Sequence, residues 1–540
     1  MGQVQPIDIV APGAFGITTE KAGLLLQPQW ATVALNAVVN KAGRVAARKG
    51  WQDQTTNAIA STPTIDVLHE YINKAGASII ISVAANKLYK DVDDFTDAGN
   101  LITSTTAPSA DHWQFINFNN KVLGFQRGEV PIEWAGSSVF TDASYTGTGP
   151  DGNCAVSAFG RVWAADADLQ TVRYSALLDD TDYSTASGGG TIDMSSVWTN
   201  DMDRIVALAS LGAMLVVFGE NHIVLWADRS GSEIGLDATQ LEVVDTIEGT
   251  GLLARDSIQV TGEGDLIFLS RHGLQALGRV IASKSNPTVT LSKNVRSNVL
   301  ESIKQTRTAD AEFDRVRSFV SPEEGLYVIN FPTQDKQYVI DLEHPFSDDD
   351  GAQVFPMTEW ILGGSIAGVL ALASTGDIYF GSAGVVGKYA GFDDNAVAYD
   401  FELQTGWLNF ENLNHNIKML KEIVTSIQTG NQEIVWNWEF DFNGTQLTRS
   451  TTYTLSSKRA EFNVSEFSDG GGAGVGYNDP AIGAASGETE FSGSAVIQRK
   501  LIPAHGEGQF LKLGVTASVN GTEIVVQHLS VSPKIGRMVT

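Results

Sequence analysis

A short apolar unit that recurs along the chain constrains its fold more than any other feature. The stretch from Ala207 to Trp226, ALASLGAMLVVFGENHIVLW, holds a single formal charge. A membrane-spanning helix needs about 20 uninterrupted apolar residues, but Gly212 and the Gly-Glu-Asn-His sequence at 219–222 divide this run. Short runs rich in Val and Ile between turn residues are typical of buried strands. The stretch therefore predicts three strands joined by two turns, and no membrane span.

Six further segments repeat this pattern, and the units begin roughly 40 to 60 residues apart. They are Ile65–Val92, Trp113–Gly136, Val156–Ala176, Ser257–Gly278, Val316–Leu342 and Ile366–Gly391. Each is a meander of three or four strands that cannot bury both of its faces alone. Radial stacking of such units makes a β-propeller, whereas a pair of packed sheets is the alternative. We expect an all-β chain with a propeller of about six to seven blades, and the absence of repeated Gly-His and Trp-Asp pairs excludes a WD40 array.

The segments on the N-terminal side and between the units suggest two additions to the propeller. Residues 1–60 are expected to form an N-terminal arm, with a helix from Trp30 to Asn40 that ends at Gly43. The propeller is expected over 61–400, with a short helical insertion near 292–306.

The pattern changes after about residue 400, where a separate domain is expected over 401–540. In EIVWNWEFDFNG, apolar residues from Ile434 to Phe442 occupy alternate positions, which predicts a strand with one apolar face. Residues 510–531 read as a hairpin, with Asn520-Gly521 suited to a type I′ turn. We expect a β-sandwich or barrel-like domain, with a glycine-rich loop at 468–488 that is too rich in glycine to pack.

The charge balance limits the kinds of partner. The chain has 63 acidic and 36 basic residues and a net charge of −27. Its only basic cluster is Arg44, Arg48 and Lys49, so the composition excludes tight wrapping of nucleic acid. An acidic surface suits a wall that DNA slides past, or it simply keeps the protein soluble. The basic cluster could serve docking or a subunit contact, or form a solvated edge.

The sequence offers no motif that supports catalysis or metal binding. Cys154 is the single cysteine, which excludes a disulfide framework and fits a reducing cytoplasm. The GxGxxG match at 147–152 contains Pro150 and precedes a meander instead of a helix, and the sequence around Gly387-Lys388 lacks the other residues of a phosphate loop. The histidines form no HExxH pair, and no Gly-x-Ser-x-Gly elbow occurs.

Two acidic clusters also lack the spacing of a calcium loop, and both read as solvated loops. They comprise Asp91, Asp93, Asp94 and Asp97, and Asp348 to Asp350. The N-terminus lacks a basic region followed by a long apolar run, so no signal peptide is expected. We expect no enzymatic activity, and no catalytic, cofactor-binding or metal-binding residue.

The opening residues nevertheless match a known pattern. The segment from Ala11 to Trp51 combines an Ala-Pro-Gly start, a Trp-Ala to Asn segment at 30–36, and Gly43-Arg44 running into ARKGW. Two further stretches match: GRVW at 160–163 with VRYS at 172–175 and Asp182-Tyr183, and the C-terminal sheet that ends in Gly536-Arg537. These features resemble the tail nozzle, or tail hub, proteins of short-tailed bacteriophages (podoviruses), which include tail tubular protein B. The resemblance spans most of the chain.

This resemblance implies a structural virion protein of the phage tail, assembled in the cytoplasm of the bacterial host. It implies a propeller with added β domains, and a homohexamer around a channel that is attached to the tail adaptor. Tail fibres are a further candidate partner. Duplex DNA would be retained in the channel and then ejected through it, without sequence-specific binding. The loop at 468–488 is a candidate gate.

Two other classes of function stay open. One is a carbohydrate-binding or glycan-processing propeller, such as a phage receptor-binding protein, which paired carboxylates with raised pKa in a central pocket would support. The other is an intracellular scaffold, which would be a stable monomer without affinity for a tail adaptor.

Overall fold

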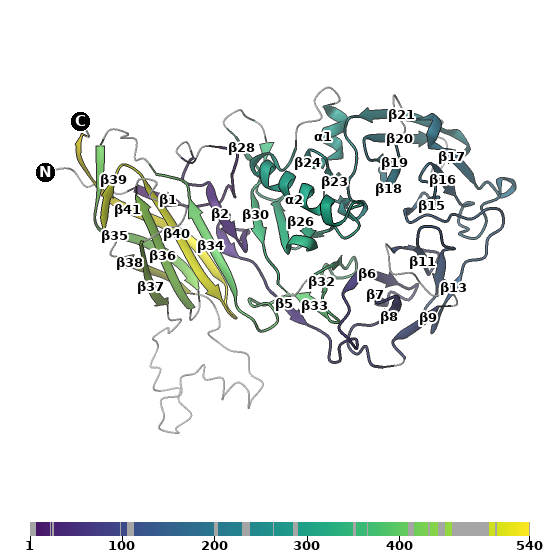
Figure 1. The fold of residues 1–540 in the computed structure, drawn as a ribbon, viewed down its shortest axis with the longest axis horizontal. Helices are drawn as coiled ribbons and strands as arrows, with labels where there is room; N and C mark the ends of the chain where they lie inside the picture. Colours follow the sequence, from purple (N-terminus) through teal and green to yellow (C-terminus); the bar gives the residue numbers. More distant parts are fainter. Residues whose placement is uncertain are drawn as a thin grey trace, which may run out of the picture. The chain divides into compact units, whose positions relative to one another are not determined.

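The computed structural model describes residues 7–21, 23, 26–97, 99–104, 113–198, 203–228, 238–262, 264–283, 290–348, 351, 353–363, 366–408, 415–429, 432–440, 449–455, 496–502 and 505–538. They form two compact units. Unit 1 comprises Met1–Gly50, Pro356–Trp360 and Ala390–Thr540, and unit 2 comprises Trp51–Phe355 and Ile361–Tyr389. Strands predominate in both units (Figure 1), so the prediction of an all-β chain is confirmed.

Unit 2 is built from small groups of antiparallel strands that follow one another along the chain (Figure 1), and a parallel pairing joins the first two groups, sheets I and II, at one edge. Sheet I contains β6 (Ile65–Ile72), β7 (Ser78–Ala84), β8 (Lys87–Lys90) and β9 (Leu101–Ser104). Sheet II contains β10 (Gln114–Phe118), β11 (Lys121–Phe125), β12 (Ile132–Trp134) and β13 (Val139–Asp142). Sheet III contains β14 (Ala155–Ala158), β15 (Arg161–Ala165), β16 (Thr171–Tyr174) and β17 (Gly190–Asp193). Sheet IV contains β18 (Ile205–Leu211), β19 (Met214–Gly219), β20 (His222–Asp228) and β21 (Leu241–Glu248).

The remaining sheets of unit 2 have three or four strands. Sheet V is β22 (Gln259–Val260), β23 (Leu266–Ser270) and β24 (Gly273–Ala276), and sheet VI is β25 (Arg317–Ser321), β26 (Leu326–Phe331) and β27 (Lys336–Asp341). Sheet VII is β31 (Gly368–Ala371), β32 (Ile378–Gly381), β33 (Val386–Tyr389) and β5 (Trp51–Asp53). Two helices, α1 (Leu277–Ala282) and α2 (Arg296–Ala309), lie between sheets V and VI in the sequence, and the short pair β28 (Phe346–Ser347) and β29 (Gln353–Val354) follows sheet VI.

The seven apolar units of the sequence all fold as antiparallel meanders. In sheet IV, Leu215 pairs with Trp226 and Val217 with Val224, and the first turn places Gly212 at φ +57°. Glycine adopts this left-handed conformation without steric cost. The strand and turn assignment of residues 207–226 is therefore confirmed. No helix in the described part of the chain is long and apolar enough to cross a membrane.

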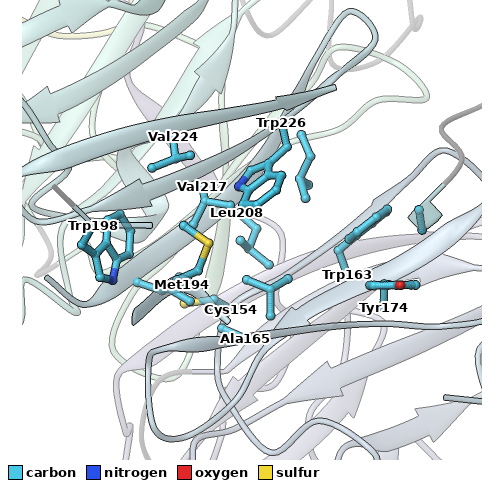
Figure 2. Packing of buried hydrophobic residues seen from close by; sticks show 14 residues of the cluster. Cys154, Trp163, Ala165, Tyr174, Met194, Trp198, Leu208, Val217, Val224 and Trp226 are labelled. Atoms are coloured by element: carbon cyan, nitrogen blue, oxygen red, sulfur yellow. The ribbon is translucent and has the colours of Figure 1, made fainter. Parts of the chain in front are cut away.

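Successive sheets of unit 2 pack face to face through apolar cores. One core joins sheets III and IV and contains Trp163, Met194 and Trp226 (Figure 2). Comparable cores join sheet I to II, II to III, and IV to V. Each sheet thus covers the face that its neighbour cannot bury alone, and this burial is the main source of stability in such a stack.

The last sheet of unit 2 packs back onto the first. Ile65 and Leu68 of sheet I share a buried cluster with Val386 of sheet VII. The buried carboxylate of Glu70 on β6 accepts hydrogen bonds from Ser78 Oγ (2.7 Å), from the Ala373 backbone N–H (2.6 Å) and from the Ser374 hydroxyl. The turn before β32 is thereby fixed on sheet I.

Unit 1 contains two larger sheets. Sheet VIII has the order β3 (Ala37–Val39), β4 (Val45–Ala47), β41 (Ile524–Met538), β35 (His415–Thr429), β38 (Val496–Ile502), with β1 (Ile7–Val10) on β41 and β39 (Gly506–Gly508) on β35. Sheet IX has the order β30 (Met357–Trp360), β2 (Ala31–Leu35), β34 (Tyr399–Thr405), β40 (Leu511–Val519), β36 (Gln432–Phe440), β37 (Arg449–Leu455). The strand predicted by alternation is β36, with Ile434, Trp436 and Trp438 buried.

The helix expected from Trp30 to Asn40 was a wrong prediction. These residues form β2 and β3 on either side of Asn36, which has φ +52°. Threonine and valine favour strands, and β2 finds its partner in β34, with Leu35 opposite Glu402. Gly43 does adopt a left-handed conformation, but in the turn between β3 and β4.

The hairpin expected over 510–531 was also wrong. β40 pairs with β34 and β36 in sheet IX, whereas β41 pairs with β35 in sheet VIII. The Asn520-Gly521 turn therefore carries the chain from one sheet to the other. Gly521 has φ +75°, and its N–H donates to the carbonyl oxygen of Phe392.

The other expected segments are distributed as follows. Residues 1–60, expected as an arm, are divided between unit 1 and unit 2. The helix expected near 292–306 corresponds to α2, and the glycine-rich loop at 468–488 lies outside the described residues.

Candidate functional site

A cavity of about 380 Å³ is lined by the first strand of each of sheets I to VII. One lining residue from each sheet is Leu68, Phe115, Val156, Leu208, Gln259, Arg317 and Val369. Each of these strands begins its meander, so the cavity lies where the seven sheets meet. Its volume falls within the range of small-molecule sites.

Arg255 ties opposite parts of this cavity together at one end. The guanidinium donates to the carbonyl oxygens of Asn153 (2.7 Å) and Trp113 (3.1 Å), which immediately precede sheets III and II. It also forms a two-bond ion pair with Asp256, at 2.9 Å from Nε and 2.8 Å from Nη2. Because Arg255 itself precedes sheet V, one side chain joins sheet V to sheets II and III, which come about 100 residues or more earlier in the chain.

Sheet VI is held by the same group of charges. Arg317 of β25 forms an ion pair with the carboxylate of Asp256, and the Ser318 hydroxyl donates to the Asp256 carbonyl oxygen (3.0 Å). The side chain of Arg255 is only 9% exposed. Burial favours the neutral form of Arg255, but the adjacent Asp256 carboxylate outweighs it and raises the pKa of the guanidinium. The charge on Arg255 is therefore permanent, and we name Arg255, Asp256 and Arg317 the charged closure.

A second, smaller hollow of about 40 Å³ adjoins the charged closure. It has room for a few water molecules and no more. Asp314 lies in its wall, where burial and the nearby carboxylates of Asp310 and Glu312 raise its pKa to about 7. Glu312 in turn accepts hydrogen bonds from Arg127 (3.3 Å) and Arg204 (3.4 Å).

Two groups that could react, Cys154 beside the small hollow and His69 in the cavity wall, are held in unreactive states. Cys154 donates its thiol proton to the Val206 carbonyl oxygen (2.8 Å), and burial raises its pKa to about 11. A thiol with so high a pKa remains protonated and is a poor nucleophile. His69 contacts Asn117 Oδ1 (3.0 Å), and burial lowers its pKa to about 4, so the imidazole is neutral at pH 7. Cys154 and His69 are therefore poorly suited to nucleophilic and acid chemistry at pH 7, whereas the carboxyl group of Asp314 titrates near neutral pH.

The three basic residues singled out in the sequence are not one surface patch. Arg48 is completely buried in unit 1, where Nη1 and Nη2 contact the Asp394 carboxylate at 2.8 and 2.6 Å and Nε donates to Asn36 (3.0 Å). Its guanidinium lies 4.1 Å from the ring centroid of Tyr399. The expectation that Arg48 serves docking or forms a solvated edge is therefore wrong. Arg44 and Lys49 are half-buried.

The motifs that the sequence excluded as nucleotide-binding or calcium-binding sites occupy turns, loops and strands. The segment 147–152 connects sheets II and III, and Gly387-Lys388 lies within β33. Asp94 accepts hydrogen bonds from Asn57 and Thr96, and Asp97 from the Gly99 N–H, so both carboxylates stabilise loops. Among the described residues, no group of three or more His, Cys, Asp or Glu side chains is arranged to hold a metal ion.

The charged closure could not be predicted from the sequence. Its only local signal is the Arg-Asp pair at 255–256 directly before a meander. The partner Arg317 lies 61 residues beyond Asp256, and the Trp113 carbonyl lies 142 residues before Arg255. No spacing rule connects them, because they become neighbours only when the sheets assemble.

Comparisons with known proteins leave the chain without an assigned family. No protein-family profile and no curated sequence matches it. The computationally designed Ika8 protein aligns with a TM-score of 0.35 and 12% identity, over 63% of this chain and 99% of the designed chain. The extracellular domain of a proposed hybrid two-component system from B. thetaiotaomicron aligns with a TM-score of 0.28 and 9% identity, over 65% of this chain and 41% of that domain. Both scores are too low to support an argument.

Proposed function

We propose that this chain is a structural virion protein that forms the tail nozzle of a short-tailed bacteriophage. Six copies would surround a channel, attach to the tail adaptor, and retain the genome until it is ejected into the host. The observation that carries this proposal is the resemblance of residues 11–51 to the N-terminus of tail nozzle proteins. The net charge of −27 supports it, because an acidic wall does not hold duplex DNA.

We further propose that unit 2 is a seven-bladed β-propeller, and that sheets VIII and IX of unit 1 form a β-sandwich. The support for the propeller is the cavity to which all seven first strands contribute, together with the packing of sheet VII onto sheet I. The guanidinium of Arg255 bridges sheets II, III and V at one side of this cavity, and we propose that DNA passes between subunits and not through a propeller.

Electron microscopy of the protein bound to a purified tail adaptor tests the proposed nozzle. A six-fold ring at the distal end of the adaptor is the expected result. A monomer at the tip of a fibre would refute the nozzle and favour a receptor-binding protein.

A carbohydrate-binding propeller is the second candidate, and the size of the central cavity favours it. Against it, the stacked rings of Trp113 and Phe115 are buried in the wall, where they offer little surface to a sugar. Glycan binding by the purified chain would support this candidate.

A further inference from the structure

One arginine in the wall of the cavity shared by sheets I to VII keeps unused hydrogen-bond donors. Arg317 lies on β25, and its side chain is 11% exposed. Its Nη1 donates to the carboxylate of Asp256. Within the part of the chain that the structure describes, Nε and Nη2 of Arg317 have no hydrogen-bond acceptor. Because a guanidinium carries five N–H donors in a rigid fork, Arg317 retains donors for a ligand.

The charges in the cavity wall do not balance. Among the described residues, the charged side chains that line the cavity are Arg255, Asp256 and Arg317. Both guanidiniums contact the single carboxylate of Asp256, so one positive charge remains over. His69 also lines the cavity, but its imidazole is neutral at pH 7 because burial lowers its pKa to about 4. A largely buried charge without a counterion is costly, and an anion in the cavity would supply that counterion.

The carboxyl group of Asp314 does not remove this imbalance. Asp314 lines the small hollow and not the cavity. Its pKa is raised to about 7, so most of the group is protonated at about pH 6. At that pH, Arg255 and Arg317 share the ionised carboxylate of Asp256.

The rest of the cavity wall is mainly apolar. Its side chains include Leu68, Phe115, Val156, Leu208 and Val369. Val260 on β22 also lines the cavity and is 61% exposed, so the cavity reaches the surface beside this strand. Small-molecule sites commonly combine an apolar wall with a few polar groups that orient the ligand. A matching ligand has an apolar body and a single anionic group.

We infer that this cavity binds a small, largely apolar carboxylic acid as its anion, with the carboxylate paired to the free donors of Arg317. The fork of a guanidinium fits the two oxygens of a carboxylate with two parallel hydrogen bonds. The apolar wall offers few partners to a ligand with many hydroxyl groups, so this ligand class differs from a carbohydrate. The site lies within one chain and does not depend on the proposed nozzle.

Isothermal titration calorimetry of the full chain at about pH 6 tests the inference. The probes are phenylacetate, which is ionised at this pH, and phenylacetamide, which has nearly the same shape but no charge. Phenylacetate should bind at one site per chain and at least about tenfold more tightly than phenylacetamide.

A pair of variants locates the binding site. Arg317→Met should weaken phenylacetate binding at least about tenfold. Arg315→Met is the matched control and should leave binding unchanged, because Arg315 is exposed and does not line the cavity. Arg317→Met also breaks the ion pair with Asp256, so its thermal midpoint is measured first. If this variant is unfolded, Arg317→Lys replaces it, since lysine keeps the charge but lacks the planar fork, and it should also weaken binding.

Three results would overturn the inference. One is equal affinity for phenylacetate and phenylacetamide. Another is equal affinity for phenylacetate in the original chain and in the folded Arg317 variant. The third is no binding of phenylacetate up to about 10 mM, a weak affinity even for so small a ligand. None of these results bears on the proposed nozzle.

Discussion

Replacing Arg255 by methionine should destabilise unit 2 by about 3 kcal/mol. Methionine retains much of the apolar volume but removes four hydrogen bonds, two to carbonyl oxygens and two to Asp256. Removing one partner of a buried ion pair costs about 3–5 kcal/mol, since the remaining charge stays buried. The lower end applies here because Asp256 keeps its contact with Arg317. At about 2 °C per kcal/mol for a unit of this size, the thermal midpoint should fall by roughly 6 °C.

Differential scanning calorimetry of the full chain can measure this shift. Arg271→Met is the matched control, because Arg271 is largely exposed and lies 3.8 Å from its partner Glu220. An exposed pair of this kind contributes little, so the control should move the midpoint by no more than about 1 °C. Equal midpoints for Arg255→Met and Arg271→Met would show that the charged closure does not hold the sheets together.

Four further predictions concern other buried groups. Arg48→Met should destabilise unit 1 by about 3–5 kcal/mol, whereas Arg44→Met should change stability by less than about 0.5 kcal/mol, as measured by urea unfolding. Glu70→Ala should cost about 2–3 kcal/mol and speed hydrogen exchange at the turn that Glu70 fixes; unchanged exchange there would contradict its assigned role. Because folding raises the pKa of Asp314 from 3.8 to about 7, the free energy of unfolding should fall as pH rises through this window, and Asp314→Asn should remove that slope. Folding lowers the pKa of His69 from 6.5 to about 4, so the free energy of unfolding should fall as pH falls from 6.5 to 4. The variant His69→Gln should show a smaller loss over this pH range.

The strands of unit 2 could be predicted because their signals are local. A Val- and Ile-rich run ends at a glycine or asparagine turn, and the partner strand begins directly afterwards, as between β18 and β19. The segment from Trp30 to Asn40 lacks this property. Its apolar residues fit a helix as well as a strand, and the partner of β2 that decides the matter, β34, lies more than 360 residues away.

The wrong hairpin has a related cause. Asn520-Gly521 correctly marks a turn, but a turn signal does not say which strands will pair. β40 and β41 each pair with strands earlier in the chain, in different sheets. The charged closure escaped prediction for the same reason, since Arg317 lies 61 residues beyond Asp256 in a different sheet. Arg48 escaped because burial of an arginine depends on Asp394, 346 residues further on.

The division of unit 1 between the two ends of the chain has a consequence for its synthesis. Unit 2 is almost continuous in sequence and can begin to fold while the ribosome is still adding residues. β1 must wait for β41, because Ile7 pairs with Val531. At about 5–20 residues per second this delay is roughly 25–100 s, during which β1 to β4 have no completed sheet to join. Slower translation lengthens that interval, so the fraction of chains with a correctly folded unit 1 should depend on elongation rate more strongly than the fraction with a correctly folded unit 2.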